Sequence, residues 1–168
     1  IRAESNNVKI LAGDGDDHID GGFRYLDAGD GDDFIEIYNF NHTVDYFDGG
    51  TGTDELVFIP NNGFHGDFAA NGSDLWSSAI TNVEKITFKN GSYSVNLGDQ
   101  AAGDGQSIEI DAENSASSNG RGTFSVSSTF EGDITFKGSV GVDNVTLGKG
   151  DDVVTLGDGD DIVYSGLG

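Results

Sequence analysis

The sequence predicts an all-β fold in which very short strands alternate with tight turns. Three observations support this prediction: a nine-residue repeat, glycines at alternate positions inside each unit, and one apolar residue at a fixed place near its end. The last three residues of a unit, with a single apolar side chain pointing inward, suit a short strand. One unit then makes half a turn of a coil, and two units make a rung of about 18 residues.

Six units hold this repeat in phase, on the frame x-G-x-G-x-D-x-U-x, in which U is apolar. They are residues 12–20 (AGDGDDHID), 28–36 (AGDGDDFIE), 49–57 (GGTGTDELV), 138–146 (GSVGVDNVT), 147–155 (LGKGDDVVT) and 156–164 (LGDGDDIVY). Isolated solvated turns are also rich in Asp and Gly, but they would not keep a nine-residue phase. Position six is Asp17, Asp33, Asp54, Asp143, Asp152 and Asp161, and position eight is Ile19, Ile35, Leu56, Val145, Val154 and Val163.

The residue types in this frame point to calcium. Alternate glycines allow positive φ, so the backbone turns tightly and its carbonyl oxygens converge on one point. Calcium accepts about six to eight hard oxygen ligands, among them carbonyls and carboxylates. We therefore expect calcium ions between loops one rung apart, with the position-six aspartate completing each site. The candidate metal-binding residues are Gly13, Asp14, Gly15, Asp16, Asp17, Gly29, Asp30, Gly31, Asp32, Asp33, Gly49, Gly50, Thr51, Gly52, Thr53, Asp54, Gly138, Gly141, Asp143, Gly148, Gly150, Asp151, Asp152, Gly157, Asp158, Gly159, Asp160 and Asp161.

These units resemble the RTX (repeats in toxin) family, whose consensus is G-G-x-G-x-D-x-U-x. The resemblance covers roughly a third of the chain. It implies a right-handed parallel β-roll, calcium sites between stacked loops, and secretion by a one-step route from Gram-negative bacteria. Position one departs from the consensus, because it is often Ala or Leu. That position contributes mainly backbone, so we expect the sites to survive.

The spacing of the N-terminal units predicts a stack of three loops. Asp33 follows Asp17 by 16 residues and Asp54 follows Asp33 by 21, and both intervals are close to one rung. Three stacked loops enclose two metal sites. The opposite side is then expected to consist of irregular connections, residues 21–27 and 37–48.

The C-terminal units predict a third site. Asp143 and Asp161 are 18 residues apart, so their loops should stack. The loop that contains Lys149 should lie on the other side of the roll. Its partner there would be the loop that begins at Ser165, which leaves a half-site near residues 149–152.

The chain is expected to form one continuous solenoid with three segments. Residues 1–57 and 138–168 hold the repeats, and residues 58–137 are predicted to be a metal-free β-helix. Alternating apolar runs predict strands at residues 86–88, 93–97, 108–110, 124–126 and 134–136. Residues 63–78 are expected to form a surface excursion, and a helix is indicated only at residues 75–80. The run from Gly49 to Asp99 is similar to segments of bacterial surface-layer proteins and large RTX adhesins.

Composition excludes several classes of partner. The 30 acidic residues outnumber 8 basic ones, for a formal net charge of -22, which argues against nucleic acid and calls for divalent cations as countercharge. The 11 Phe, 5 Tyr and single Trp argue against disorder. No apolar stretch is long enough to span a membrane. There is no cysteine for a disulfide. The N-terminus has no features of a signal peptide, and residues 165–168 open a repeat that is not finished, so we take the chain as an excised fragment of a longer array.

No constellation indicates an enzyme. His18, His42 and His65 are scattered without an H-E-x-x-H motif, and neither a G-x-S-x-G elbow nor a cysteine nucleophile is present. Trp76 could stack on a sugar together with Phe64 and Phe68, although such aromatics more often anchor a loop to the core. Arg24 is interpreted as a cation in the place of calcium in a degenerate unit.

The sequence therefore favours a calcium-binding structural module of a secreted bacterial surface protein, such as an adhesin or a surface-layer protein. Calcium would fold it outside the cell. Its partners would be other copies or neighbouring domains of the parent protein, and a cell-surface glycan. One alternative is an accessory domain of a secreted protease, lipase or alginate epimerase. Another is a carbohydrate-binding module.

Overall fold

The computed structural model describes residues 1–4, 8–38, 46–59, 80–89, 93–97, 106–112, 121–126 and 130–166, and every regular element in these residues is a β-strand. In chain order they are β1 (Arg2–Glu4), β2 (Lys9–Asp14), β3 (His18–Gly22), β4 (Tyr25–Asp30), β5 (Phe34–Tyr38), β6 (Tyr46–Asp48), β7 (Glu55–Ile59), β8 (Ile80–Thr81), β9 (Lys85–Phe88), β10 (Tyr93–Leu97), β11 (Ile108–Asp111), β12 (Arg121–Val126), β13 (Ile134–Lys137), β14 (Val142–Thr146), β15 (Val153–Thr155) and β16 (Ile162–Tyr164).

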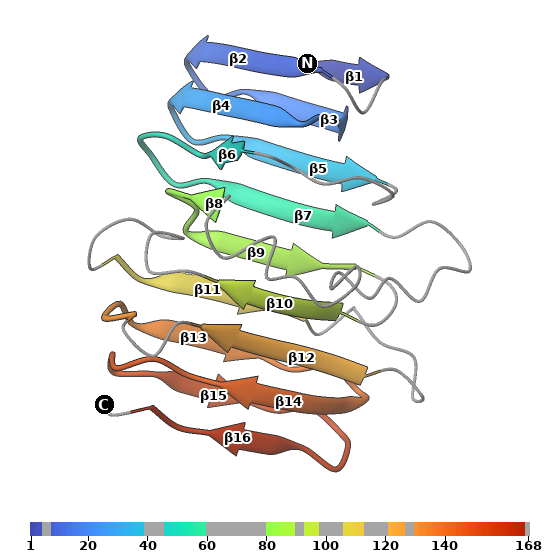
Figure 1. Cartoon of the computed structure of the whole chain (residues 1–168), viewed down its shortest axis with the longest axis vertical. Coiled ribbons are helices and arrows are strands. Elements are labelled where there is room, and N and C mark those ends of the chain that lie inside the picture. The colour runs from blue at the N-terminus through green and yellow to red at the C-terminus, as the bar shows by residue number, and fades with distance from the viewer. Residues whose placement is uncertain are drawn as a thin grey trace.

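The strands alternate between two faces of a coil (Figure 1). The odd-numbered strands, β1 to β15, form one eight-stranded sheet in chain order. The even-numbered strands form two four-stranded sheets, β2-β4-β6-β8 and β10-β12-β14-β16. Neighbouring strands pair in parallel throughout, for example β3 with β5 and β14 with β16. This arrangement confirms the predicted parallel β-roll.

Rung length varies along the chain while the strands stay in register. Hydrogen bonds between equivalent positions of adjacent rungs join residues 16, 21 and 30 apart in the N-terminal half. Near the C-terminus they join residues 18 apart, so two nonapeptides make one rung there, as predicted. The connections between strands therefore absorb the differences in rung length.

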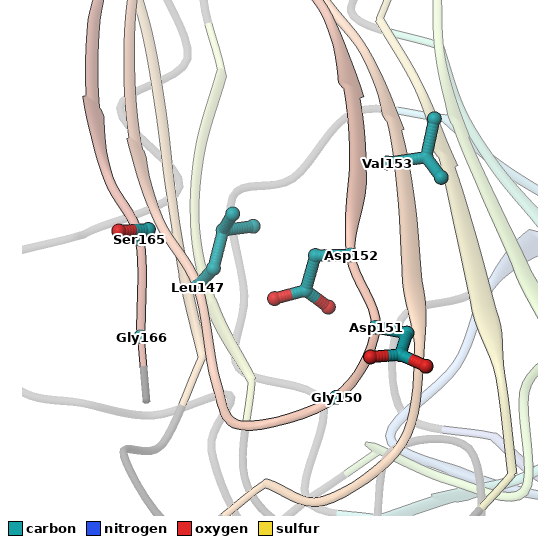
Figure 2. Close-up of a pocket in the computed structure, with 7 residues that line it drawn as sticks. All are labelled: Leu147, Gly150, Asp151, Asp152, Val153, Ser165 and Gly166. Atoms are coloured by element: carbon teal, nitrogen blue, oxygen red, sulfur yellow. The ribbon is translucent and has the colours of Figure 1, made fainter. Parts of the chain in front are cut away.

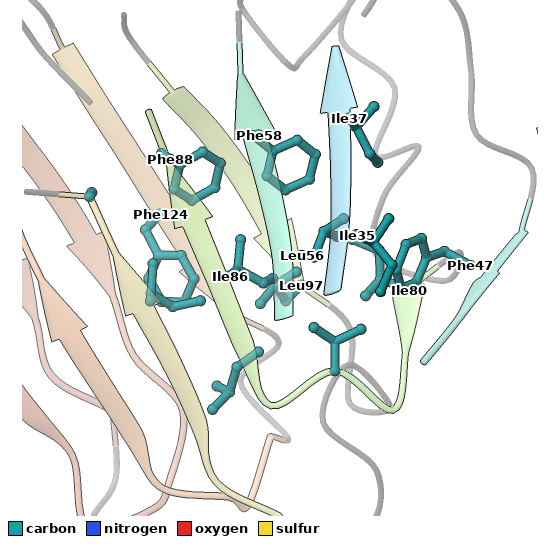
Figure 3. Close-up of a cluster of buried hydrophobic side chains, with 14 of the residues drawn as sticks. Ile35, Ile37, Phe47, Leu56, Phe58, Ile80, Ile86, Phe88, Leu97 and Phe124 are labelled. Atoms are coloured by element: carbon teal, nitrogen blue, oxygen red, sulfur yellow. The ribbon is translucent and has the colours of Figure 1, made fainter. Parts of the chain in front are cut away.

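Apolar side chains stack in columns along the axis of the roll (Figure 3). The position-eight residues Ile19, Ile35 and Leu56 are adjacent in register and have no exposed surface, and Ile86 continues their column. Burial of each such side chain stabilises the fold by about 1.5–3 kcal/mol. Position eight thus points inward as predicted. Val163 is 39% exposed because β16 is the last strand of its sheet.

The eight-stranded sheet continues through the segment without repeats, whereas the first four-stranded sheet ends there at β8 and the second begins at β10. Strands β9 to β13 coincide with the five predicted alternating runs. Phe58 stacks on Phe88 with ring centroids 5.2 Å apart, and Phe124 packs against Phe136 at 5.3 Å. Aromatic rings thus extend the core where the nonapeptides are absent.

Two expectations about connections are wrong. Residues 21–27 are not irregular, because β3 runs to Gly22 and β4 begins at Tyr25, and buried Phe23 anchors the short turn between them. Residues 37–38 and 46–48 likewise lie in β5 and β6, while residues 39–45 are outside the described residues. The helix predicted at residues 75–80 is wrong at Ile80, because Ile80 is the first residue of β8. The other residues of that helix, 75–79, lie outside the described residues, and so does the whole surface excursion predicted at 63–78.

Candidate calcium-binding loops

The three N-terminal loops, residues 12–17, 28–33 and 49–54, stack on one edge of the roll. Gly13 pairs with Gly29 in register, and a bridge joins Asp30 to Thr51. Each loop leads from the first four-stranded sheet into a strand of the eight-stranded sheet. The stacking predicted from the spacing of the aspartates is therefore observed.

In the second and third N-terminal loops, glycine at position two is required by both backbone angle and packing. Gly29 and Gly50 have φ of 108° and 102°. A Cβ atom on Gly29 would overlap the carbonyl oxygen of Gly13, and one on Gly50 would overlap that of Gly29. Any side chain here would push the loops apart, so glycine sets the close approach of one loop to the next.

The position-six aspartates reach back to the preceding rung. Oδ1 of Asp33 accepts a hydrogen bond from the backbone N–H of Asp17 at 2.8 Å, and Oδ1 of Asp54 accepts one from the N–H of Asp33 at 2.9 Å. These side chains are almost fully buried, with 2% of Asp33 and 1% of Asp54 exposed. In both, Oδ2 is buried without a hydrogen-bond partner among the described residues.

A buried carboxylate oxygen without a partner is costly, and the pKa values reflect this cost. Burial, together with the nearby carboxylate of Glu84, raises the pKa of Asp54 to about 6. Burial also raises the pKa of Asp33, helped by the charges of Asp17, Asp16 and Asp32. A bound cation would give each Oδ2 atom a partner and would offset the negative charge of the buried carboxylates.

The position-five aspartates point in the opposite direction. Oδ1 of Asp16 accepts a hydrogen bond from the N–H of Asp32 at 3.0 Å, and Oδ1 of Asp32 accepts one from the N–H of Thr53 at 2.8 Å. Adjacent loops are therefore tied in both directions. Among the described residues, no three His, Asp or Glu side chains gather closely enough to hold a metal alone. A calcium ion between these loops would thus depend on backbone carbonyls as well, which are ligands that calcium accepts.

The C-terminal loops 138–143 and 156–161 stack as predicted on the opposite edge. Oδ1 of Asp161 accepts a hydrogen bond from the N–H of Asp143 at 2.9 Å, which repeats the N-terminal pattern. The carboxylate of Asp143, however, folds onto its own loop. It accepts hydrogen bonds from the N–H of Ser139 at 2.7 Å and from its hydroxyl at 3.1 Å. Ser139 was missed as a site residue, although it is the one position two that is not glycine.

The Lys149 loop lies on the same edge as the N-terminal loops. Ser165 and Gly166 line a pocket beside it, together with Asp152 and Leu147 (Figure 2), so the predicted partner is in place. The prediction named only this one partner, but the Lys149 loop also stacks on residues 130–134. The full lining of the pocket is Leu147, Gly150, Asp151, Asp152, Val153, Ser165 and Gly166.

Contacts with residues 130–134 follow the repeat frame. The N–H of Asp151 donates to Oδ1 of Asp133 at 2.8 Å, and Oδ1 of Asp152 accepts from the N–H of Ile134 at 3.0 Å. Lys149 pairs with Glu131 at 3.3 Å. Residues 130–134 are therefore a repeat loop whose sixth position is Ile134. The aspartate that would have revealed this loop in the sequence is absent.

The remaining candidates lie away from the stacked loops. His18 faces outward, as predicted, and its Nε2 is 3.3 Å from Glu36 Oε2. Arg24 lies in the turn between β3 and β4, where its N–H donates to the carbonyl of Val8 at 3.1 Å. His42, His65, Phe64, Phe68 and Trp76 are outside the described residues.

Comparison with known families agrees with this geometry. The family described as "RTX calcium-binding nonapeptide repeat (4 copies)" matches residues 1–23 and 137–168. Calcium is the metal that these repeats bind. The loops at residues 28–33 and 49–54 lie outside the matched RTX segments but stack in register with residues 12–17. No curated protein and no solved structure matches the chain. Among the described residues, no helix could cross a membrane.

Proposed function

We propose that this chain is a structural module of a secreted bacterial surface protein, such as an adhesin or a surface-layer protein, that folds when it binds calcium outside the cell. Its role is structural and not catalytic, and its partners are neighbouring domains or other copies of the parent protein and a cell-surface glycan. The observation that carries the proposal is the pair of buried, unpartnered Oδ2 atoms of Asp33 and Asp54 inside stacked loops.

The chain's charge supports calcium-dependent folding. Asp16, Asp17 and Asp32 lie close enough to Asp33 to raise its pKa, so the folded loops concentrate negative charge. The formal net charge of -22 adds repulsion over the whole chain. Calcium supplies positive charge and oxygen coordination. Ligand binding to the folded state alone stabilises it by about 2.7 kcal/mol per site at a hundredfold excess over Kd.

This coupling suits an exported protein. Free calcium is scarce inside cells, so the acidic chain would stay unfolded there and pass through a secretion channel. Outside, a few sites would contribute as much as the whole stability of a typical domain, about 5–15 kcal/mol. The roll would therefore form only after export.

A calcium titration followed by circular dichroism tests this proposal. Ionic strength is held fixed so that screening of the acidic residues stays constant. We expect β structure to develop as calcium is added and to be lost on chelation. Equal β content with and without calcium would refute the coupling of folding to metal. Secretion is tested separately, by expressing the parent gene and locating the product.

A further inference from the structure

A fourth loop continues the N-terminal stack beyond the last recognisable repeat. Asp48 pairs with Thr81 in register, and Glu55 pairs with Lys85. Residues 82–84 therefore stack below residues 49–54, although this loop is shorter and has no Gly-x-Gly. The sequence placed it in a segment expected to hold no metal.

Glu84 occupies the place of a position-six aspartate. Its Oε2 accepts a hydrogen bond from the backbone N–H of Asp54 at 2.8 Å. Asp54 makes the same backward contact with Asp33, and Asp33 makes it with Asp17. The extra methylene of glutamate lets the carboxylate reach the preceding rung from a shorter loop. Glu84 thus extends the line of carboxylates by one rung.

Gly49 packs closely against this fourth loop. A Cβ atom at this position would overlap the carbonyl oxygen of Asn82 and lie 2.7 Å from Oδ2 of Asp54, so both oxygens lie on the same side of Gly49. The first two loops have Ala12 and Ala28 at the equivalent position. Among the three N-terminal loops, only the third therefore has a glycine that lets the carbonyl of the next loop approach its buried carboxylate.

The oxygens at this junction are short of positive charge. Oδ2 of Asp54 has no hydrogen-bond partner among the residues that the structure describes, and the residue is 1% exposed. The nearby ammonium of Lys85 pairs with Glu55, with 3.3 Å between Nζ and Oε1. Two carboxylates, those of Asp54 and Glu84, and the carbonyl of Asn82 thus lie at the junction of the two loops.

We propose that Glu84, Oδ2 of Asp54 and the carbonyl oxygen of Asn82 bind a further calcium ion, at the boundary between the repeats and the segment that follows. The inference rests on the proposed calcium-dependent function and adds a non-repeat ligand to it. The ion would end the N-terminal row of sites and join residues 80–89 to the calcium-dependent part of the fold.

A purely structural role for Glu84 predicts something different. In that case its carboxylate only accepts the hydrogen bond from Asp54, and the uncharged amide oxygen of glutamine would do the same. Glu84→Gln keeps the acceptor and removes the charge. Glu4→Gln is the matched control, because Glu4 is exposed on β1 and its substitution changes the net charge equally.

The full chain and both variants are compared by equilibrium dialysis against radioactive calcium, with circular dichroism to confirm folding in saturating calcium. We expect Glu84→Gln to bind one ion fewer than the unmutated chain and Glu4→Gln to bind the same number. Equal stoichiometry and affinity in Glu84→Gln would overturn the Glu84 site and leave the proposed function intact. An unmutated chain that binds no calcium would overturn the proposed function itself.

A second variant covers the case in which Glu84→Gln does not fold. Glu84→Asp keeps the charge but is one methylene too short for the short loop. It should bind the same number of ions as the unmutated chain, with the affinity of one of them reduced about tenfold or more. Unchanged affinities at every site in this variant would overturn the proposal.

Discussion

The backbone N–H of Asp33 donates a hydrogen bond to Oδ1 of Asp54, one rung further along the chain, at 2.9 Å. Asp33 in turn accepts the N–H of Asp17 through its own Oδ1. Each aspartate therefore holds the backbone of the rung before it and has its own backbone held by the rung after it. Loss of one carboxylate should be felt by two loops.

The aspartates should differ in importance. Asp33→Ala removes the acceptor for Asp17 and a charged candidate ligand from the middle loop, so it should weaken calcium-dependent folding more than Asp17→Ala does. We expect Asp33→Ala to cost about 1–3 kcal/mol in the free energy of unfolding. The measurement is the calcium midpoint of folding at fixed ionic strength.

Glu4→Ala is the control for this series, because Glu4 is exposed on β1 and lies outside the stacked loops. Its calcium midpoint should match that of the unmutated protein. If Asp33→Ala needs no more calcium than Glu4→Ala, the acids contribute only diffuse charge.

Substitutions at two glycines with nearly equal φ distinguish the cost of backbone strain from the cost of separating the stacked loops. Gly13 has φ of 107° and no atom near the site of a Cβ, whereas Gly29, with φ of 108°, faces the carbonyl of Gly13. Gly13→Ala should cost only the strain of an unfavourable φ, about 1–3 kcal/mol. Gly29→Ala should cost clearly more, because the loops must also separate. Urea unfolding in saturating calcium measures both, and equal losses would contradict close stacking.

Acid should stabilise the calcium-free fold. The folded-state pKa of Asp54, about 6, lies above its ordinary value of 3.8. Its protonation therefore stabilises the fold fully below pH about 3.8, and this contribution is lost as pH rises through about 6. We expect calcium-depleted protein to gain β structure between pH 7 and pH 4, as seen by circular dichroism.

Asp54→Asn checks the assignment of this pH response. The amide does not titrate, so the variant should respond less to acid over the same range. In saturating calcium the trend should reverse, because protons compete with the metal for carboxylates. A calcium-free fold that loses stability on mild acidification would contradict the burial of these groups.

Much of the fold follows from the phase of the repeat. The interval of 18 residues between Asp143 and Asp161 predicts one rung, and Ile19 and Ile35 mark the inward face correctly. The loops at residues 82–84 and 130–134 could not be found in this way. Glu84 replaces the aspartate in a shortened loop, and Ile134 replaces it with an apolar side chain. Stacking there is set by backbone register with the neighbouring rungs, which leaves no motif in the sequence.

Magnesium offers a test of the donor set. The stacked loops supply oxygens from a flexible arrangement of carbonyls and carboxylates, whereas magnesium requires near-octahedral geometry and retains its water. We therefore expect magnesium to induce much less β structure than calcium at the same concentration. An equal response to both ions would mean that the loops gather charge without building a calcium site.

The dependence of the fold on calcium is tested most directly by thermal unfolding of the full chain, with calcium and with chelator, at one ionic strength. With calcium, we predict a cooperative loss of β structure at high temperature. With chelator, we predict that most of the β structure is already absent at room temperature. An unchanged melting temperature in chelator would contradict the account.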